Sequence, residues 1–99
     1  MKIKASKTSR GFSRLDFTDL YGTECSLQQS SLAECRTPGA SAVWLGCNDA
    51  DPKVMVSGKG WQPVPLPEGT VCNTRMHLDP TMVKQLIKRL QKWVDTGKF

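Results

Sequence analysis

The most regular pattern of apolar and polar positions lies at the C-terminal end of the chain. Across residues 80–96 the apolar side chains recur every three or four positions, as on one side of a helix: Val83, Leu86, Ile87, Leu90 and Val94, with Met82 or Trp93 at the edge. Asp79 is a favoured N-cap, and Pro80 has no N–H to leave unsatisfied in a first helical turn. Gly97 stands where a left-handed residue would end the helix. The pattern predicts an amphipathic helix over about 80–96.

Shorter segments alternate with a period of two, which is typical of half-buried strands. They predict strands at about 12–18, 23–28, 42–47 and 71–78, and the turn signal at residues 19–22 joins the first two as a hairpin. Alternate positions of a strand point to the same face of the sheet, and we call each such set of positions a parity. The parity expected to point into the core carries Leu15, Phe17, Cys25, Leu27, Val43, Leu45, Cys47, Met76 and Leu78. Trp44 and His77 fall on the opposite parity. The predicted fold class is α+β, a three- to five-stranded antiparallel sheet with the C-terminal helix packed on one face.

The segments between these elements are polar or rich in glycine and proline. Residues 29–41 predict a loop around Thr37, Pro38 and Gly39, and residues 53–56 allow a short strand. Prolines at alternate positions from 63 to 67 exclude a central strand and favour an extended loop, because proline has no N–H for a ladder. We expect Trp61, Val64 and Leu66 to hold that loop over the sheet.

Charge is distributed unevenly along the 99 residues, whose net charge is +5. Residues 1–14 carry five basic side chains and no acid, residues 80–99 carry five basic side chains against one acid, and the rest carries four against eight. Residues 1–10 have little to bury and predict a flexible basic arm, followed by a single domain over 11–99. Such basic ends attract an acidic partner or a phosphate backbone, although charge runs also serve simply as solvated faces. The candidate partner-binding residues are Lys84, Lys88, Arg89, Lys92, Arg10 and Arg14.

Catalytic and metal-binding chemistry find little support in the residues. Cys25, Cys35, Cys47 and Cys72 lack the close C-x-x-C spacing of zinc sites, so free thiols are expected. His77 is the single histidine, and its parity turns it away from the predicted core. The chain is therefore expected to be non-enzymatic, with no cofactor and no metal. No apolar run approaches the ~20 residues of a membrane-spanning helix, and residues 1–10 lack the apolar stretch expected of a secretory signal.

Four segments carry a resemblance to a known group of proteins. They are residues 11–22 (GFSRLDFTDLYG), 25–33 (CSLQQSSLA), 43–48 (VWLGCN) and 73–78 (NTRMHL), the last followed by the helix. Together they resemble a family of small proteins encoded by bacteriophages and prophages. The resemblance implies a location in the host bacterial cytoplasm and a role in binding, for instance as an inhibitor of a host defence component such as a CRISPR effector (an anti-CRISPR protein). It carries no catalytic residue to this chain.

Two functions follow as expectations. The first is a non-catalytic binding protein that inhibits a host protein or ribonucleoprotein complex. The alternative is a nucleic-acid-binding accessory module that uses the basic helix face and the N-terminal arm. A weaker third idea is a small-ligand sponge with a pocket under the 61–67 loop. A homodimer is also compatible with an exposed Trp44 or Trp93.

Overall fold

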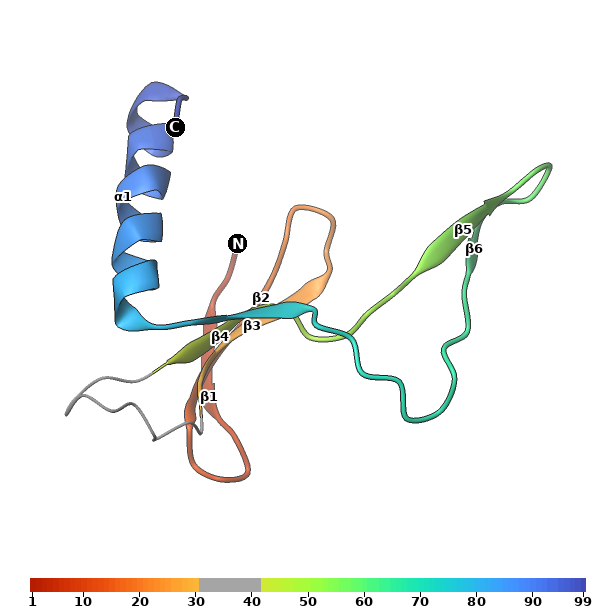
Figure 1. Ribbon diagram of the computed structural model, residues 1–99, viewed down its shortest axis with the longest axis horizontal. Helices are drawn as coiled ribbons and strands as arrows, with labels where there is room; N and C mark the ends of the chain where they lie inside the picture. Colours follow the sequence, from red (N-terminus) through yellow and green to blue (C-terminus); the bar gives the residue numbers. More distant parts are fainter. Residues whose placement is uncertain (31–41) are drawn as a thin grey trace.

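Five antiparallel strands form the main sheet, in the spatial order β1-β2-β3-β4-β7 (Figure 1). The computed structural model describes residues 1–30 and 42–99. A separate hairpin, β5–β6, and one helix, α1, complete the described part. The element bounds are β1 Lys4–Lys7, β2 Ser13–Thr18, β3 Glu24–Gln29, β4 Val43–Cys47, β5 Lys53–Val56, β6 Gly60–Pro63, β7 Arg75–Leu78 and α1 Pro80–Thr96. The predicted α+β class with an antiparallel sheet and a C-terminal helix is confirmed.

The register of the sheet gathers the apolar side chains on one face. Leu15 lies opposite Leu27, which lies opposite Leu45, which lies opposite Met76. Because neighbouring positions along a strand point to opposite faces, residues that face each other across strands share one side of the sheet. We call this side the apolar face; its members are Leu15, Phe17, Cys25, Leu27, Val43, Leu45, Cys47, Met76 and Leu78. The predicted inward parity is therefore confirmed.

No second layer of the described chain covers the apolar face. The apolar side chains buried in the described part are Cys25 and Ala42 alone, and Met76 is 54% exposed. Leu15, Phe17, Leu27, Val43 and Leu45 are only half-buried. The sheet is thus a single layer whose apolar side chains shield one another.

The helix α1 has the predicted bounds but not the predicted packing. The Asp79 carboxylate accepts a hydrogen bond from the N–H of Met82 at 2.8 Å, and Gly97, at φ 73°, donates its N–H to the Trp93 carbonyl. None of its residues is buried, and Leu90 remains 53% exposed. The prediction that it packs on the sheet is wrong for the single chain.

The connection between β7 and α1 explains this. Strand β7 ends at Leu78 and α1 begins at Pro80, so Asp79 alone joins them, in an extended conformation with ψ 171°. Connections between strands and helices that fold back on one another typically have 2–6 residues. With one extended residue, α1 continues away from the end of β7 and stands clear of the sheet (Figure 1).

Two further expectations are corrected by strand pairing. Residues 4–7, expected in a flexible arm over 1–10, form the edge strand β1 paired with β2 from Lys4 opposite Asp16 to Lys7 opposite Ser13. The polar sequence of residues 4–7 gives no sign of a strand, because this strand is stabilised by backbone pairing with β2 and not by burial of apolar side chains. The strand at 53–56 is confirmed, but residues 60–63 pair with it as a hairpin that points away from the sheet (Figure 1). Trp61 is 64% exposed there, so the loop does not lie over the sheet as expected.

The overall shape is extended. The radius of gyration is 16.9 Å, against about 13 Å for a compact chain of this length. The loop signal at 37–39 and Cys35 lie outside the described residues. Within the described part, the helix is too short and too polar to cross a membrane.

Candidate partner-binding surfaces

The first candidate surface is the row of basic side chains on α1. Lys84, Lys88 and Lys92 follow one another at intervals of four residues and are all exposed. Two ion pairs form in the described part of the chain, Arg14 with Asp16 and Lys53 with Asp51, and neither involves α1. Arg89 stands beside the row and donates a 3.3 Å hydrogen bond to the main-chain oxygen of Phe99. We call Lys84, Lys88, Arg89 and Lys92 the helix cations.

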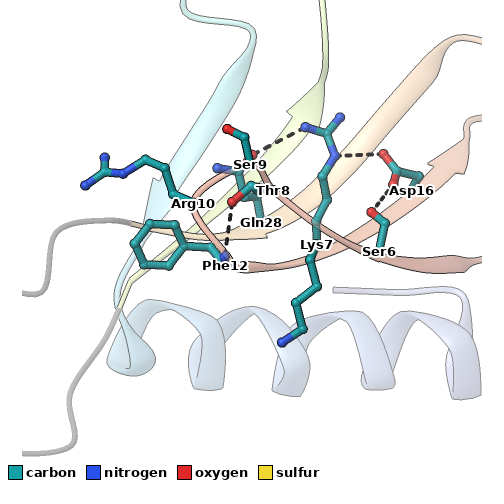
Figure 2. Close-up of a pocket in the computed structure, with 9 residues that line it drawn as sticks. Ser6, Lys7, Thr8, Ser9, Arg10, Phe12, Asp16 and Gln28 are labelled. Atoms are coloured by element: carbon teal, nitrogen blue, oxygen red, sulfur yellow. Dashed lines mark hydrogen bonds and ion pairs between the residues drawn. The ribbon is translucent and has the colours of Figure 1, made fainter.

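The other two predicted contacts, Arg10 and Arg14, lie far from the helix in sequence and share a shallow depression of ≈ 520 Å³ beside the β1–β2 turn (Figure 2). The Arg10 guanidinium lies 5.5 Å from the centre of the Phe12 ring, close enough for a cation–π attraction. Thr8 fixes the turn, because its hydroxyl accepts a 3.1 Å hydrogen bond from the N–H of Phe12. The depression therefore joins two of the six predicted residues, while the other four stay together on α1.

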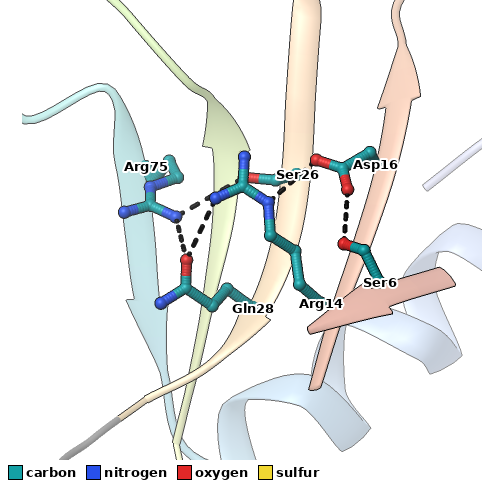
Figure 3. Close-up of polar contacts among 6 residues, drawn as sticks. All are labelled: Ser6, Arg14, Asp16, Ser26, Gln28 and Arg75. Carbon is teal, nitrogen blue, oxygen red and sulfur yellow. Dashed lines mark hydrogen bonds and ion pairs between the residues drawn. The ribbon is translucent and has the colours of Figure 1, made fainter. Parts of the chain in front are cut away.

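Arg14 belongs to a chain of polar contacts that crosses the sheet on the side opposite the apolar face (Figure 3). Its Nε donates to Asp16 Oδ1 at 2.8 Å, and its Nη1 lies 3.4 Å from Gln28 Oε1. Arg75, on the edge strand β7, donates to the same Gln28 oxygen at 3.0 Å and lies 3.4 Å from the Ser26 hydroxyl. Two guanidinium groups thus converge on one neutral amide oxygen. We call Ser6, Arg14, Asp16, Ser26, Gln28 and Arg75 the polar network.

The electrostatics of the polar network are unbalanced. Asp16 is its one carboxylate, and the hydrogen bond from Arg14, followed by that from the Ser6 hydroxyl, lowers the pKa of Asp16. Asp16 is therefore paired with Arg14, and within the described residues the hydrogen bonds of Arg75 go to neutral acceptors, Gln28 and Ser26. The guanidinium donor already carries a charge, and a carboxylate or phosphate would add the attraction of an opposite charge and a second, parallel hydrogen bond that Gln28 does not supply.

Two rings stand next to the network. Trp44 and His77 lie opposite each other on β4 and β7, and their rings stack with centroids 3.9 Å apart. The Arg75 guanidinium lies 5.9 Å from the centre of the Trp44 ring. Because each ring covers one side of the other, the pair offers fewer free aromatic faces to a nucleobase than two separate rings would.

His77 also makes a contact that resembles a nucleophile–base pair. Its Nε2 lies 2.9 Å from the Ser30 hydroxyl oxygen. Ser30 is buried at 6% exposure, and His77 is held by the stack with Trp44. A nucleophile has to reach its substrate, so this geometry suits a contact that fixes β7 against the end of β3 better than it suits catalysis.

The cysteines and acids do not assemble a metal site in the described residues. Cys25 and Cys47 lie opposite each other on β3 and β4, with their sulfurs 3.9 Å apart, and both are free thiols. Burial, followed by the contact with Cys47, raises the pKa of Cys25. Cys72 is free and exposed.

Sequence reasoning missed Gln28, Ser26 and Arg75 as a group. Gln28 and Arg75 are 47 positions apart and meet only because β4 places β3 and β7 on either side of itself. The available signal was the parity of the strands, which put Trp44 and His77 on this side of the sheet. That parity does not predict which strands lie next to each other in the sheet.

Comparisons with known proteins returned no matching family model, no matching curated protein and no matching solved structure.

Proposed function

We propose that this protein is a non-catalytic binding protein whose helix cations contact an acidic surface of a partner protein. The observation that carries the proposal is the row Lys84, Lys88 and Lys92, exposed and outside every ion pair of the described chain. At a rise of 1.5 Å per residue, the three ammonium groups are spaced about 6 Å apart along the helix. A partner helix with acidic residues at the same four-residue interval would match this spacing.

The polar network supports the same class of partner. Arg75 donates to a neutral amide, and a carboxylate from a partner would add the attraction between opposite charges. The resemblance to bacteriophage and prophage proteins adds a target class, a host defence component such as a CRISPR effector, which a bound protein can block without any chemistry. Nucleic acid is the alternative partner, because phosphates also satisfy lysine and arginine. The mutual stacking of Trp44 and His77 favours protein over single-stranded nucleic acid, which typically uses free aromatic faces.

The test compares two variants with the same change of charge. The helix variant replaces the helix cations by serine: K84S, K88S, R89S and K92S. The control variant removes four lysines elsewhere: K2S, K53S, K59S and K98S. Both are used with the wild type to capture binding partners from a bacterial host lysate, and the captured protein is then purified and titrated calorimetrically.

The expected result is one defined protein that the wild type and the control variant bind, and that the helix variant binds at least about tenfold more weakly. Circular dichroism shows whether the helix variant still folds. Equal binding by both variants would contradict the role of the helix cations. Binding that is lost on nuclease treatment, and that falls steeply between roughly 50 and 200 mM salt, would identify nucleic acid as the partner instead.

A further inference from the structure

One chain displays two complementary apolar surfaces that do not meet. The first is the apolar face of the main sheet, which no described element covers. The second is the apolar side of α1, where Ile87 is 60% and Val94 is 70% exposed. A sheet with one apolar face and a helix with one apolar stripe normally bury these against each other in a two-layer domain. Here both layers exist, and the contact between them is missing.

The two surfaces cannot meet within one chain in this arrangement. Asp79 is the whole connection between β7 and α1, and it is extended. The hydrogen bond that the Met82 N–H donates to the Asp79 carboxylate stabilises this geometry, because it ties the first turn of α1 to the residue that joins it to β7. A helix that lies on the apolar face would therefore come from another molecule.

The exposed area supports the same conclusion. The accessible surface is 8387 Å², whereas a compact monomer of 11.0 kDa exposes about 5,600 Å². Residues 31–41, whatever their conformation, expose no more than about 1,600 Å². An excess of at least about 1,200 Å² therefore belongs to the described residues, and the apolar face and α1 share it with the protruding β5–β6 hairpin (Figure 1). Stable protein interfaces bury about 800 Å² per partner, and obligate dimers bury more.

We propose that two copies of this chain form a symmetric dimer in which α1 of each copy lies on the apolar face of the other copy's sheet. The sizes agree, since α1 is about 26 Å long and five strands span about 19 Å across the sheet. A two-fold axis satisfies both copies at once, because each supplies the surface that the other lacks. Leu90 lies near the middle of the apolar side of α1, and the row of Lys84, Lys88 and Lys92 lies on the opposite side. The helix cations therefore stay exposed in the dimer, and the dimer does not depend on the proposed function.

The first test is the mass of the full chain in solution by sedimentation equilibrium at about 5–100 μM. A dimer has twice the 11.0 kDa mass of the chain. The variant L90K places a charge in the proposed interface, and the matched control Q85K adds the same charge on the polar side of the same helix. Because the substitution occurs twice in a symmetric dimer, L90K is expected to raise the dissociation constant by about 100-fold or more. Q85K is expected to leave it within about threefold.

A second measurement locates the contact without a substitution. A dimer mixed from isotope-labelled and unlabelled wild-type chains is examined for nuclear Overhauser effects between chains. Contacts from the Leu90 methyl groups to Leu27 and Leu45 of the other chain would support the proposal. A monomeric mass at 100 μM would overturn it, as would a dimer whose chains contact each other only helix to helix. Equal dimerisation of L90K and Q85K would also overturn it.

Discussion

Gly46 lies opposite the first residue of β7, and replacing it with alanine gives a sharp test of the sheet. Its φ is 150°, and it lies opposite Ser26 on one side and Arg75 on the other. A Cβ atom at this position would collide with the carbonyl oxygen of Thr74 and would lie 2.9 Å from the Cα of Arg75. Both are backbone atoms, so no side-chain rotation relieves the overlap.

Two costs add in Gly46→Ala. Holding a non-glycine residue in a sparsely populated backbone region costs about 1–3 kcal/mol. Forcing an extra methyl group into packed atoms costs a further ~1–3 kcal/mol. The expected loss in the free energy of unfolding is therefore about 2–6 kcal/mol, a large part of the ~5–15 kcal/mol of a typical domain.

The matched control is Gly22→Ala in the β2–β3 turn. Gly22 also has a positive φ, 81°, but nothing lies within 4 Å of an added Cβ. It should show the conformational cost alone, so the difference between the two variants isolates the collision with β7. Urea denaturation followed by circular dichroism measures both losses. Tryptophan fluorescence reports β7 separately, because displacement of β7 would open the stack of Trp44 on His77.

A loss of stability in Gly46→Ala no greater than in Gly22→Ala would refute the collision with the backbone next to β7. A loss of stability in Gly46→Ala with unchanged fluorescence of the folded state would also refute the collision, since β7 would then not have moved.

Three further predictions concern the thiols, a carboxylate and the helix cap. Iodoacetamide should alkylate Cys72 much faster than Cys25, because Cys72 is exposed and burial raises the pKa of Cys25; peptide mass spectrometry follows both, and equal rates would contradict this. The pKa of Asp16 is lowered by Arg14, so its contribution to stability is present above its unfolded-state pKa and is lost as the pH falls through the lower folded-state value. Asp16→Asn should remove that acid-range dependence from unfolding curves, and an unchanged dependence would assign it to other groups. Asp79→Ala removes the N-cap hydrogen bond and should lower the stability of α1 by about 0.5–2 kcal/mol, seen as lower helix content by circular dichroism. Asp79→Asn should retain most of the helix content, because asparagine is also a favoured N-cap.

Local features of this chain were predictable because their causes are local. The bounds of α1 follow from Asp79, Pro80 and Gly97, whose preferences act within one turn of the helix. The inward parity of β2, β3, β4 and β7 follows from the two-residue repeat of a strand. The exposure of the helix cations followed from their opposition to the apolar stripe, whereas partner binding by the six basic residues stays a prediction.

The polar network and the position of α1 were not predictable in this way. Gln28 and Arg75 meet because of the order in which strands pair, and that order depends on contacts between residues far apart in the chain. Strand β1 is polar throughout and is a strand only because β2 offers it a ladder. An amphipathic pattern likewise states that a helix has an apolar side without stating what covers it.

The sequence by itself therefore determined a capped amphipathic helix, a set of alternating strands and basic residues at both ends. The tertiary structure alone decided that the helix stands away from its own sheet and that two arginines share one glutamine. The physical reason is the sequence separation over which the interactions act. Capping and periodicity depend on neighbours within a few residues. Layers and polar networks depend on how whole elements are placed, which here includes the single residue that joins β7 to α1.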